Sequence, residues 1–377
     1  MSTALRTAAG LCALALMSAC DAQPAATTAG AAGASIAVTA SDNACQVSAN
    51  TAPAGNITFQ IANQGTKVTE FYLYGPGDRI MGELENIAPG LTRRLIVEVA
   101  EAGTYQAACK PGMAGAGIRS PFTVTGSTGK GTGANAQLTE AARSYARYLA
   151  SQTGAFTDET KKFAEAIRAK DVNGAKAQYT LARIHYERIE PVAAKFGDLD
   201  PAIDAREADL QPGRKFTGFH RLEKDLWVTG LQPDSAAIAD QLVADVTTLG
   251  RKATALPLTA LDLANGAKSL LDEVATKKIT GEEENFSHTD LTDFQANVDG
   301  SKGAVQALRP ILVERDPALV SGLDSRFADV QKLLDAQRTG GAFKLYTELT
   351  PDQIKQFASA VDALSEPLSR VAEVVAK

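Results

Sequence analysis

The sequence predicts a multi-domain protein in which an N-terminal β-sandwich over residues 36–125 is followed by an all-α helical bundle over residues 136–377. The first region contains short runs of β-branched and aromatic residues separated by Gly, Pro and Asn, as expected for strands. From residue 136 onwards, apolar residues recur every three or four positions, which is the period of an amphipathic helix. Between these regions, residues 126–135 read GSTGKGTGAN, a composition typical of a flexible linker.

The composition allows two such domains and restricts their function. The chain has 377 residues, of which 45% are hydrophobic and 22% charged, so it can bury a sizeable core. Its formal net charge is −6 and its pI is about 5.3. This acidity argues against non-specific nucleic-acid binding and suits a protein that handles cations.

The first twenty residues have the features of an export signal. Arg6 supplies a positive charge, and the apolar run AAGLCALALMSAC then ends in small residues before Cys20. The end of this run, LMSAC, resembles a bacterial lipobox, so that Cys20 would become the lipidated first residue; ordinary signal-peptidase cleavage nearby is the alternative. We therefore expect a signal over residues 1–20, a tether over residues 21–35, and a periplasmic protein whose membrane contact is limited to such an anchor.

Six runs predict the strands of the sandwich: SIAVTAS, GNITFQIAN, TEFYLYG, TRRLIVEV, GTYQAAC and SPFTVTG. Cys12 is lost with the signal, which leaves Cys45 and Cys109 in this domain. In an oxidising compartment these two residues are available either for a disulfide or for metal binding.

Two segments of this domain, NQGTKVTEFYLYG and GTYQAACKPGMAG, resemble the cupredoxins. In that family an Asn-x-Gly strand leads to a first His ligand of copper, and a later loop supplies Cys, His and Met. Here Thr69 and Glu70 stand where the first His is expected, and Gly112 stands where the second is expected. Because a type-1 copper site needs two imidazoles and the domain contains no histidine, blue-copper electron transfer is excluded.

Other donors nevertheless remain in the domain. Cys45, Glu70, Cys109 and Met113 offer sulfur and carboxylate ligands for copper or iron. The alternative is a Cys45–Cys109 disulfide, which would close a long loop and stabilise the domain by ~3–4 kcal/mol. The sequence leaves both interpretations open.

Eight segments after residue 136 have helical periodicity and predict a bundle of about seven to nine helices. Among them, LTEAARSYARYLASQTGAF and DETKKFAEAIRAKD are expected as separate helices, with Thr139 and Asp158 as their N-caps. Thr350 is expected to cap the last long helix, since Pro351 suits a first helical position.

The segment LARIHYERIEPVAAKFGDLDPAID, residues 181–204, gathers acidic residues on one side of a helix. Glu187 and Glu190 are three positions apart and share a face, whereas His185 points elsewhere and is interpreted as a packing or capping residue. The following turn, rich in Asp and Pro, returns Asp204 towards the pair. Two helical carboxylates and a returning aspartate form part of a hard-oxygen site suited to iron.

Two further clusters lie in the helical region. In TGFHRLEKDLW, His220 and Glu223 lie one helical turn apart, which is the half-motif that carboxylate-bridged iron proteins use. In ITGEEENFSHTD, the triplet Glu282–Glu284 is expected to start a helix, with His288 one turn on. An acidic triplet is usually a solvated surface and a single H-x-x-E often arises by chance. The coincidence of three clusters in one domain is what indicates a metal site.

Three strings, HYERIEPVAAKFGDLDPAIDAREAD, FTGFHRLEKDLW and KITGEEENFSHTDLTDFQANVDGSKGAV, closely resemble the imelysin (M75) family. With a cupredoxin-like domain and an export signal in front, the arrangement is similar to the periplasmic components of Efe-type iron-uptake systems. The resemblance covers residues 36–377. It implies the capture of iron, as Fe2+ or Fe3+, with an iron permease and a haem peroxidase-like protein as partners.

The resemblance also implies three metal sites. A carboxylate site in the helical domain consists of Glu187, Glu190, Asp204 and one member of the acidic triplet, for which we choose Glu283. A second site consists of His220 and Glu223, where the imidazole would also admit ferrous iron or zinc. The third site, in the N-terminal domain, would bind copper or ferric iron through Cys45, Glu70 and Cys109.

Two other functions remain as alternatives. The M75 label implies a metallopeptidase, but the chain lacks H-E-x-x-H, which gives zinc two imidazoles with a base between them. A polysaccharide- or calcium-binding lipoprotein would instead use the acidic residues on a calcium-bridged polymer. The clusters favour a metal-binding component of iron uptake over both alternatives.

Overall fold

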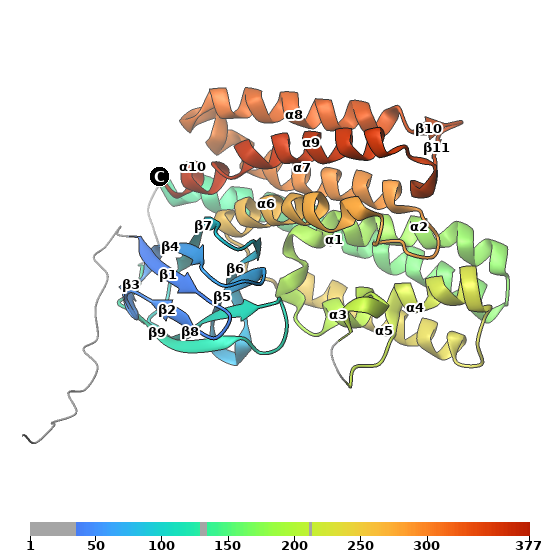
Figure 1. The fold of residues 1–377 in the computed structure, drawn as a ribbon, viewed down its shortest axis with the longest axis horizontal. Helices are drawn as coiled ribbons and strands as arrows, with labels where there is room; N and C mark the ends of the chain where they lie inside the picture. Colours follow the sequence, from blue (N-terminus) through green and yellow to red (C-terminus); the bar gives the residue numbers. More distant parts are fainter. Residues whose placement is uncertain (1–34, 129–133, 211–212) are drawn as a thin grey trace, which may run out of the picture.

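The computed structural model describes residues 35–128, 134–210 and 213–377 (Figure 1). The expected signal, Cys20 and nearly all of the expected tether lie outside these residues. The described residues form a strand-rich domain followed by a helical domain, which confirms the predicted fold class. No helix in the described ranges combines the length and the hydropathy needed to cross a bilayer.

The N-terminal domain is a sandwich of two sheets. One sheet has the strand order β2-β1-β4-β7 and the other has the order β3-β9-β8-β5-β6. Neighbours are antiparallel, except that β1 pairs with β4, and β3 with β9, in parallel. The strands are β1 (Ile36–Ala40), β2 (Cys45–Val47), β3 (Thr51–Pro53), β4 (Gly55–Asn63), β5 (Thr69–Tyr74), β6 (Ile80–Ile87), β7 (Thr92–Val99), β8 (Gly103–Pro111) and β9 (Ile118–Thr125).

Alternation along the strands decides which side chains fill the sandwich. In β4, Phe59 and Ile61 are completely buried, whereas the residues between and beside them are more exposed. The rings of Phe71 and Phe122, from the facing sheet, lie 5.1 and 5.5 Å from the ring of Phe59. The six predicted strands are present. The sequence did not predict β2 and β3, which have three residues each, or the acidic strand β6.

The helical domain contains ten α-helical segments among its described residues, one more than the largest number predicted. They are α1 (Ala134–Arg168), α2 (Val172–Ile189), α3 (Leu199–Asp204), α4 (Gly218–Lys224), α5 (Ser235–Ala253), α6 (Ala260–Thr276), α7 (Asp290–Arg315), α8 (Pro317–Asp335), α9 (Pro351–Leu368) and α10 (Val371–Ala376). Short connecting elements are 3₁₀ turns at Glu190–Phe196, Glu207–Asp209, Lys278–Thr280 and Tyr346–Glu348, a π-helical turn at Asp225–Thr229, and the ribbon β10 (Arg338–Thr339) with β11 (Ala342–Phe343).

Two of the predicted helix caps are wrong. Thr139 and Asp158 lie inside α1, which runs unbroken for 35 residues. A cap-type residue does not end a helix whose apolar stripe continues, and Leu149 and Phe156 on this stripe are completely buried. The cap at Thr350 is confirmed, because its hydroxyl accepts the N–H of the third residue of α9 at 3.3 Å.

Helix α6 joins the two domains. It packs against β6 and β7, the edge strands of the two sheets (Figure 1), and Ile96 of β7 belongs to the core of the helical domain. The side-chain amide of Asn265 in α6 donates to the Ile96 carbonyl at 2.8 Å. Lys195 donates to the Ile80 carbonyl across the same boundary at 3.4 Å. Beside these contacts the two domains enclose a cavity of about 910 Å³.

Candidate metal centre

The end of α2 presents charged side chains on one buried face. Arg183, Glu187 and Glu190 are spaced by four and three residues, so they emerge on the same side. The α-helix ends at Ile189 because Pro191 has no N–H, and the chain continues as 3₁₀ turns. The Glu187 carbonyl therefore accepts a side-chain hydrogen bond from Asn297 of α7, at 3.3 Å.

A glycine allows the next two elements to meet. Helix α3 ends with Asp204, and α4 carries His220. At the start of α4, Gly218 has a φ of 77°, and a Cβ atom there would lie 2.2 Å from the carbonyl oxygen of Ile203. Only glycine tolerates both this conformation and this approach. As a result, Oδ1 of Asp204 lies 3.6 Å from Nε2 of His220.

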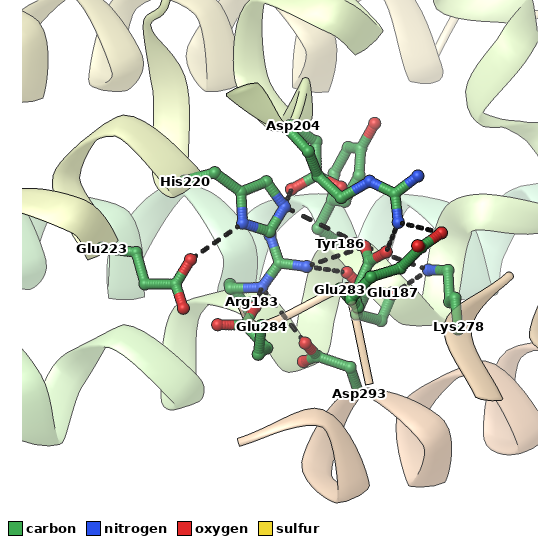
Figure 2. Close-up of polar contacts among 12 residues, drawn as sticks. Arg183, Tyr186, Glu187, Asp204, His220, Glu223, Lys278, Glu283, Glu284 and Asp293 are labelled. Atoms are coloured by element: carbon green, nitrogen blue, oxygen red, sulfur yellow. Dashed lines mark hydrogen bonds and ion pairs between the residues drawn. The ribbon is translucent and has the colours of Figure 1, made fainter. Parts of the chain in front are cut away.

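Arg183 lies at the centre of the cluster and is completely buried (Figure 2). Its planar guanidinium has five N–H donors, a geometry suited to several carboxylates at once. It pairs with carboxylates from four segments: Asp204, Glu187 (2.5 Å), Glu284 (2.5 Å), Glu283 (3.4 Å) and Asp293 (3.4 Å). Arg183 therefore ties α2 to α3, to α7 and to the turn that precedes α7.

Lys278 supplies a second buried cation, in the short 3₁₀ turn after α6. Its side chain is 1% exposed, and its Nζ atom lies 2.8 Å from Oε2 of Glu187 and 2.8 Å from both carboxylate oxygens of Glu190. Oε1 of Glu283 lies 3.4 Å from the same nitrogen. Asn297 also donates to Glu187 and Glu190, at 2.8 and 2.7 Å. The carboxylates of Glu187 and Glu190 are thus engaged by donors of the protein itself.

His220 has an unused ligand atom, as do Asp290 and Asp293, whose Oδ2 and Oδ1 atoms are also buried without a hydrogen-bond partner in the described part of the chain. The Nδ1 atom of His220 lies 3.2 Å from Oε2 of Glu223, whose Oε1 accepts the N–H groups of Phe286 and Ser287 at 2.9 and 2.7 Å. Its Nε2 atom is buried and has no hydrogen-bond partner among the described residues. This atom faces Oδ1 of Asp204 at 3.6 Å and lies 4.0 Å from an oxygen of Glu283 (Figure 2).

Two triads of possible ligand atoms converge in this cluster, each within 4.8 Å. One consists of Asp204, His220 and Glu283, and the other of His220, Glu223 and Glu284. In the second triad, Glu223 accepts two backbone N–H groups, and the hydroxyl of Ser287 donates to Glu284 at 2.7 Å. The carboxylates of the first triad are likewise paired, with Arg183 and Lys278. His220 belongs to both triads, but its unpartnered Nε2 atom faces the two carboxylates of the first, which is therefore the better candidate.

Acidic groups outnumber the permanent cations here. The carboxyl groups are Glu187, Glu190, Asp204, Glu223, Glu283, Glu284, Asp290 and Asp293, and the cations are Arg183, Lys278 and, at the rim, Arg206. Burial holds the pKa values of Glu190, Glu284 and Asp293 well above their usual range. Burial also acts on Glu187, but Lys278 and Arg183 outweigh it and lower the pKa to about 2. A multivalent cation would neutralise the surplus acidic groups and release protons.

The inter-domain cavity reaches this cluster. Its lining includes Glu190, Asp204 and Glu283 from the helical domain. From the N-terminal domain it includes the side chains of Glu70, Glu83 and Glu85. Its volume of about 910 Å³ far exceeds that of a bare ion and leaves room for ordered water. The first triad is therefore open to an acid-lined space.

The structure gathers the predicted helical-domain ligands but arranges them differently. The sequence predicted a carboxylate site and a separate His220–Glu223 site, whereas Asp204 and His220 meet, so the two form one cluster. Glu187 and Glu190 share a face, as expected, but their oxygens contact Lys278 and not the open triad. Buried carboxylates need a cation beside them, and without a metal ion the ammonium group of Lys278 takes this role.

The acidic triplet does not start a helix. It lies in a turn, and α7 begins only at Asp290. Glu283 and Glu284 are buried in the cluster, whereas the side chain of Glu282 is 51% exposed and pairs with Arg206 at 3.2 Å.

The two remaining histidines lie outside both triads. His185 contacts Gln152 at 2.8 Å, which fits its predicted packing role. His288 has a φ of 59° in the turn before α7, and its carbonyl accepts the N–H of Tyr346 at 2.8 Å.

The predicted metal site of the N-terminal domain needs correction. Cys45 and Cys109 form a disulfide, with sulfur atoms 2.01 Å apart, so neither offers a thiolate in this state. Glu70 does not join them. Cys109 is paired with Phe71 across β8 and β5 and is buried in the sandwich core, so Glu70, one residue along, points to the opposite face.

On that opposite face, Glu70 lines the inter-domain cavity. Its Oε2 atom accepts the hydroxyl hydrogen of Tyr72 at 3.0 Å, and Lys110 lies 3.9 Å away. Burial raises the pKa of Glu70 despite the opposing effects of Lys110 and Tyr72. Met113 also lines the cavity and has a φ of 56° in the turn after β8.

Five buried polar residues of the cluster were not predicted from the sequence: Arg183, Lys278, Asp290, Asp293 and Asn297. A signal for Arg183 existed, because it lies four residues before Glu187 on the same helix face. Asp290, Asp293 and Asn297 likewise follow one face of α7, with polar side chains where a packed helix normally has apolar ones. Lys278 had no such signal, since nothing distinguishes it in sequence from Lys277.

Comparisons with known proteins agree with this architecture. Residues 141–371 match the family model described as imelysin, and residues 9–119 match that of a cupredoxin-like domain. The "Iron uptake system component EfeO" of Escherichia coli K12 is 37% identical over 349 residues, covering 90% of this chain and 91% of its own. The protein of the same name from Shigella flexneri matches to the same extent.

One solved structure, reduced auracyanin from Roseiflexus castenholzii, covers 24% of this chain and 97% of its own at 21% identity, with a TM-score of 0.21 that is too low to bear on the fold. The two family matches and the EfeO relatives cover nearly the whole chain. The chain therefore belongs to the imelysin family, as an EfeO-type member with an N-terminal cupredoxin-like domain.

Proposed function

We propose that this protein binds iron in the periplasm as a component of an uptake system and delivers it to a membrane permease. Its relatives are named as iron uptake system components, and the chain spans 91% of their length. The export signal expected from the sequence agrees with a periplasmic location. A haem peroxidase-like protein is the further partner that the family resemblance implies.

The observation that supports iron binding most directly is the triad of Asp204, His220 and Glu283. Its three ligand atoms converge within 4.8 Å, and one of them is a buried imidazole nitrogen without a hydrogen-bond partner. Leaving such an atom unpaired is unfavourable unless it serves a purpose, and a metal ion is the partner that fits two carboxylates and an imidazole. The acid-lined cavity would concentrate cations at this place.

The ligand types favour iron in either valence. Carboxylate oxygens suit hard Fe3+, and the imidazole is a borderline ligand that also suits Fe2+ or zinc. Glu223 would act from behind the site, because it binds Nδ1 of His220 and so directs Nε2 towards the ion. The ion is cargo here, so it must bind reversibly.

A binding experiment tests this proposal. The full mature chain is titrated with Fe2+ without oxygen, beside the variants Glu283→Gln and Glu282→Gln. Glu283→Gln should weaken binding at least tenfold, because it removes a ligand. Glu282→Gln should bind as the wild type does, since the neighbouring Glu282 is exposed. Equal affinities of the two variants would exclude the triad as the iron site.

A further inference from the structure

The ammonium group of Lys278 lies where a bound cation would be expected. Oxygens of Glu187 and Glu190 lie 2.8 Å from its nitrogen, and an oxygen of Glu283 lies 3.4 Å away. Figure 2 shows Lys278 beside Glu187 and Glu283. The side chain is 1% exposed and lies in the 3₁₀ turn that follows α6. Three carboxylates around one positive centre form the arrangement of a metal site in which a lysine nitrogen replaces the ion.

Lys278 and the ion would compete for one carboxylate. Oε1 of Glu283 lies 3.4 Å from Nζ of Lys278 and 4.0 Å from Nε2 of His220, so it belongs both to the lysine site and to the open triad. An ion bound by the triad would be close to the ammonium group. Two like charges repel strongly at such a distance when water is excluded.

The two buried cations differ in their freedom to leave. Arg183 is held by five carboxylates through its rigid fork. Lys278 has a single charged atom on a flexible stem; it does not itself line the cavity, but its partners Glu190 and Glu283 do. A lysine in this place can withdraw into the cavity, whereas Arg183 remains as a fixed brace.

We propose that Lys278 is a tethered counter-cation that the protein exchanges for iron. When iron binds, the ammonium group moves towards the cavity, and the carboxylates of Glu187, Glu190 and Glu283 become available to the ion. When iron leaves, the ammonium group returns and neutralises them. This role rests on the proposed function, and it explains how a pocket so rich in carboxylates can release its cargo: the competitor is always present at a high effective concentration.

The first test removes the competitor. In Lys278→Met the stem is kept and the charge is lost, so Fe2+ should bind at least tenfold more tightly and dissociate more slowly. The matched control is Lys268→Met, which removes a lysine of α6 whose side chain is 14% exposed and which pairs with Asp272 away from the cluster. The control should leave the affinity and the dissociation rate unchanged.

The second test needs no substitution. Wild-type protein is acetylated with sulfo-NHS-acetate with and without Fe2+, and the peptide that contains Lys278 is examined by mass spectrometry. Lys278 should be protected in the metal-free protein and modified in the iron-loaded protein. This measurement decides the matter even if Lys278→Met does not fold without metal.

The outcomes separate the two proposals. If wild type binds Fe2+ and Glu283→Gln does not, but Lys278→Met binds no more tightly and Lys278 stays protected, then the exchange is overturned and the iron site remains. If wild type fails to bind Fe2+ at all, the proposed function itself fails. If Lys278 had only a structural role, Lys278→Met would weaken iron binding, which is the opposite of the expected change.

Discussion

His220 and Glu223 form a buried pair in which Nδ1 of the imidazole lies 3.2 Å from a carboxylate oxygen. Burial opposes the charged form of Glu223, but hydrogen bonds from His220, Ser287 and Phe286 lower its pKa below the usual value. A carboxylate only accepts, so Nδ1 of His220 must donate. In the neutral imidazole the other nitrogen then carries the lone pair, and it is the atom that faces Asp204.

Glu223→Gln should therefore weaken iron binding without removing a ligand. The glutamine side chain is neutral and stabilises the tautomer with a proton on Nδ1 less than the carboxylate does. Substitution of a residue that orients a metal ligand typically lowers metal affinity by about 10- to 100-fold. Anaerobic Fe2+ titration measures the effect. Glu207→Gln is the control, since the exposed Glu207 pairs with Lys224 at 2.6 Å on the outer side of the same region. Unchanged affinity in Glu223→Gln would remove the basis for the tautomer argument.

Gly218→Ala should separate Asp204 from His220. The new methyl group would meet the Ile203 carbonyl at 2.2 Å, so α4 would have to move away from α3. We expect a lower melting temperature together with at least tenfold weaker iron binding.

Gly213→Ala is the matched control for this change. Gly213 has a φ of 84° but no atom within 4 Å of an added Cβ, so its substitution costs only the left-handed strain of roughly 1–2 kcal/mol. If both variants lose the same stability and keep full iron affinity, the close approach of α3 and α4 does not determine the site.

Removal of the disulfide should destabilise the N-terminal domain and leave iron binding intact. The bond joins residues 64 positions apart, and closing a loop of this length stabilises the folded state by about 4 kcal/mol. Calorimetry of the full chain carrying Cys45→Ala and Cys109→Ala should show an earlier transition for this domain. Loss of Fe2+ binding in this double variant would instead restore the cysteines as ligands.

Glu83 should make stability depend on pH near neutrality. Burial, aided by Glu70 and Asp200 and opposed by Lys195, raises its pKa from 4.5 to about 7. Between these values the folded state holds a proton that the unfolded state has lost, so stability rises as the pH falls from 7 towards 4.5.

Glu83→Gln removes this dependence. In metal-free protein, the variant should melt at a higher temperature than wild type at pH 8, and the difference should shrink at pH 5. The exposed Glu101, changed to Gln, serves as the control. A difference between Glu83→Gln and wild type that is constant from pH 5 to 8 would contradict the assigned origin.

Local patterns allowed the sequence to predict the fold class and to select acidic residues and a histidine that the structure gathers in one cluster. Runs of β-branched and aromatic residues identified the long strands, and apolar residues at every third or fourth position identified the helices. The spacing of Glu187 and Glu190 correctly indicated that they share a face. The partners of these residues depend on tertiary contacts between distant segments, so Lys278 could not be recognised beside Glu187. The same limit explains Glu70, whose separation from Cys109 follows from the register of β5 against β8.

The wall of the cavity comes from two domains, and this has a consequence for the shape of the molecule. Acidic side chains of the sandwich, such as Glu83, and of the helical domain, such as Asp200, line the same cavity. Where these carboxyl groups are ionised and no counter-ion is present, they repel one another across the cavity. A multivalent cation in the cavity would screen this repulsion. A bound metal ion would then hold the two domains together, and solution scattering should find the metal-bound protein more compact than the metal-free protein.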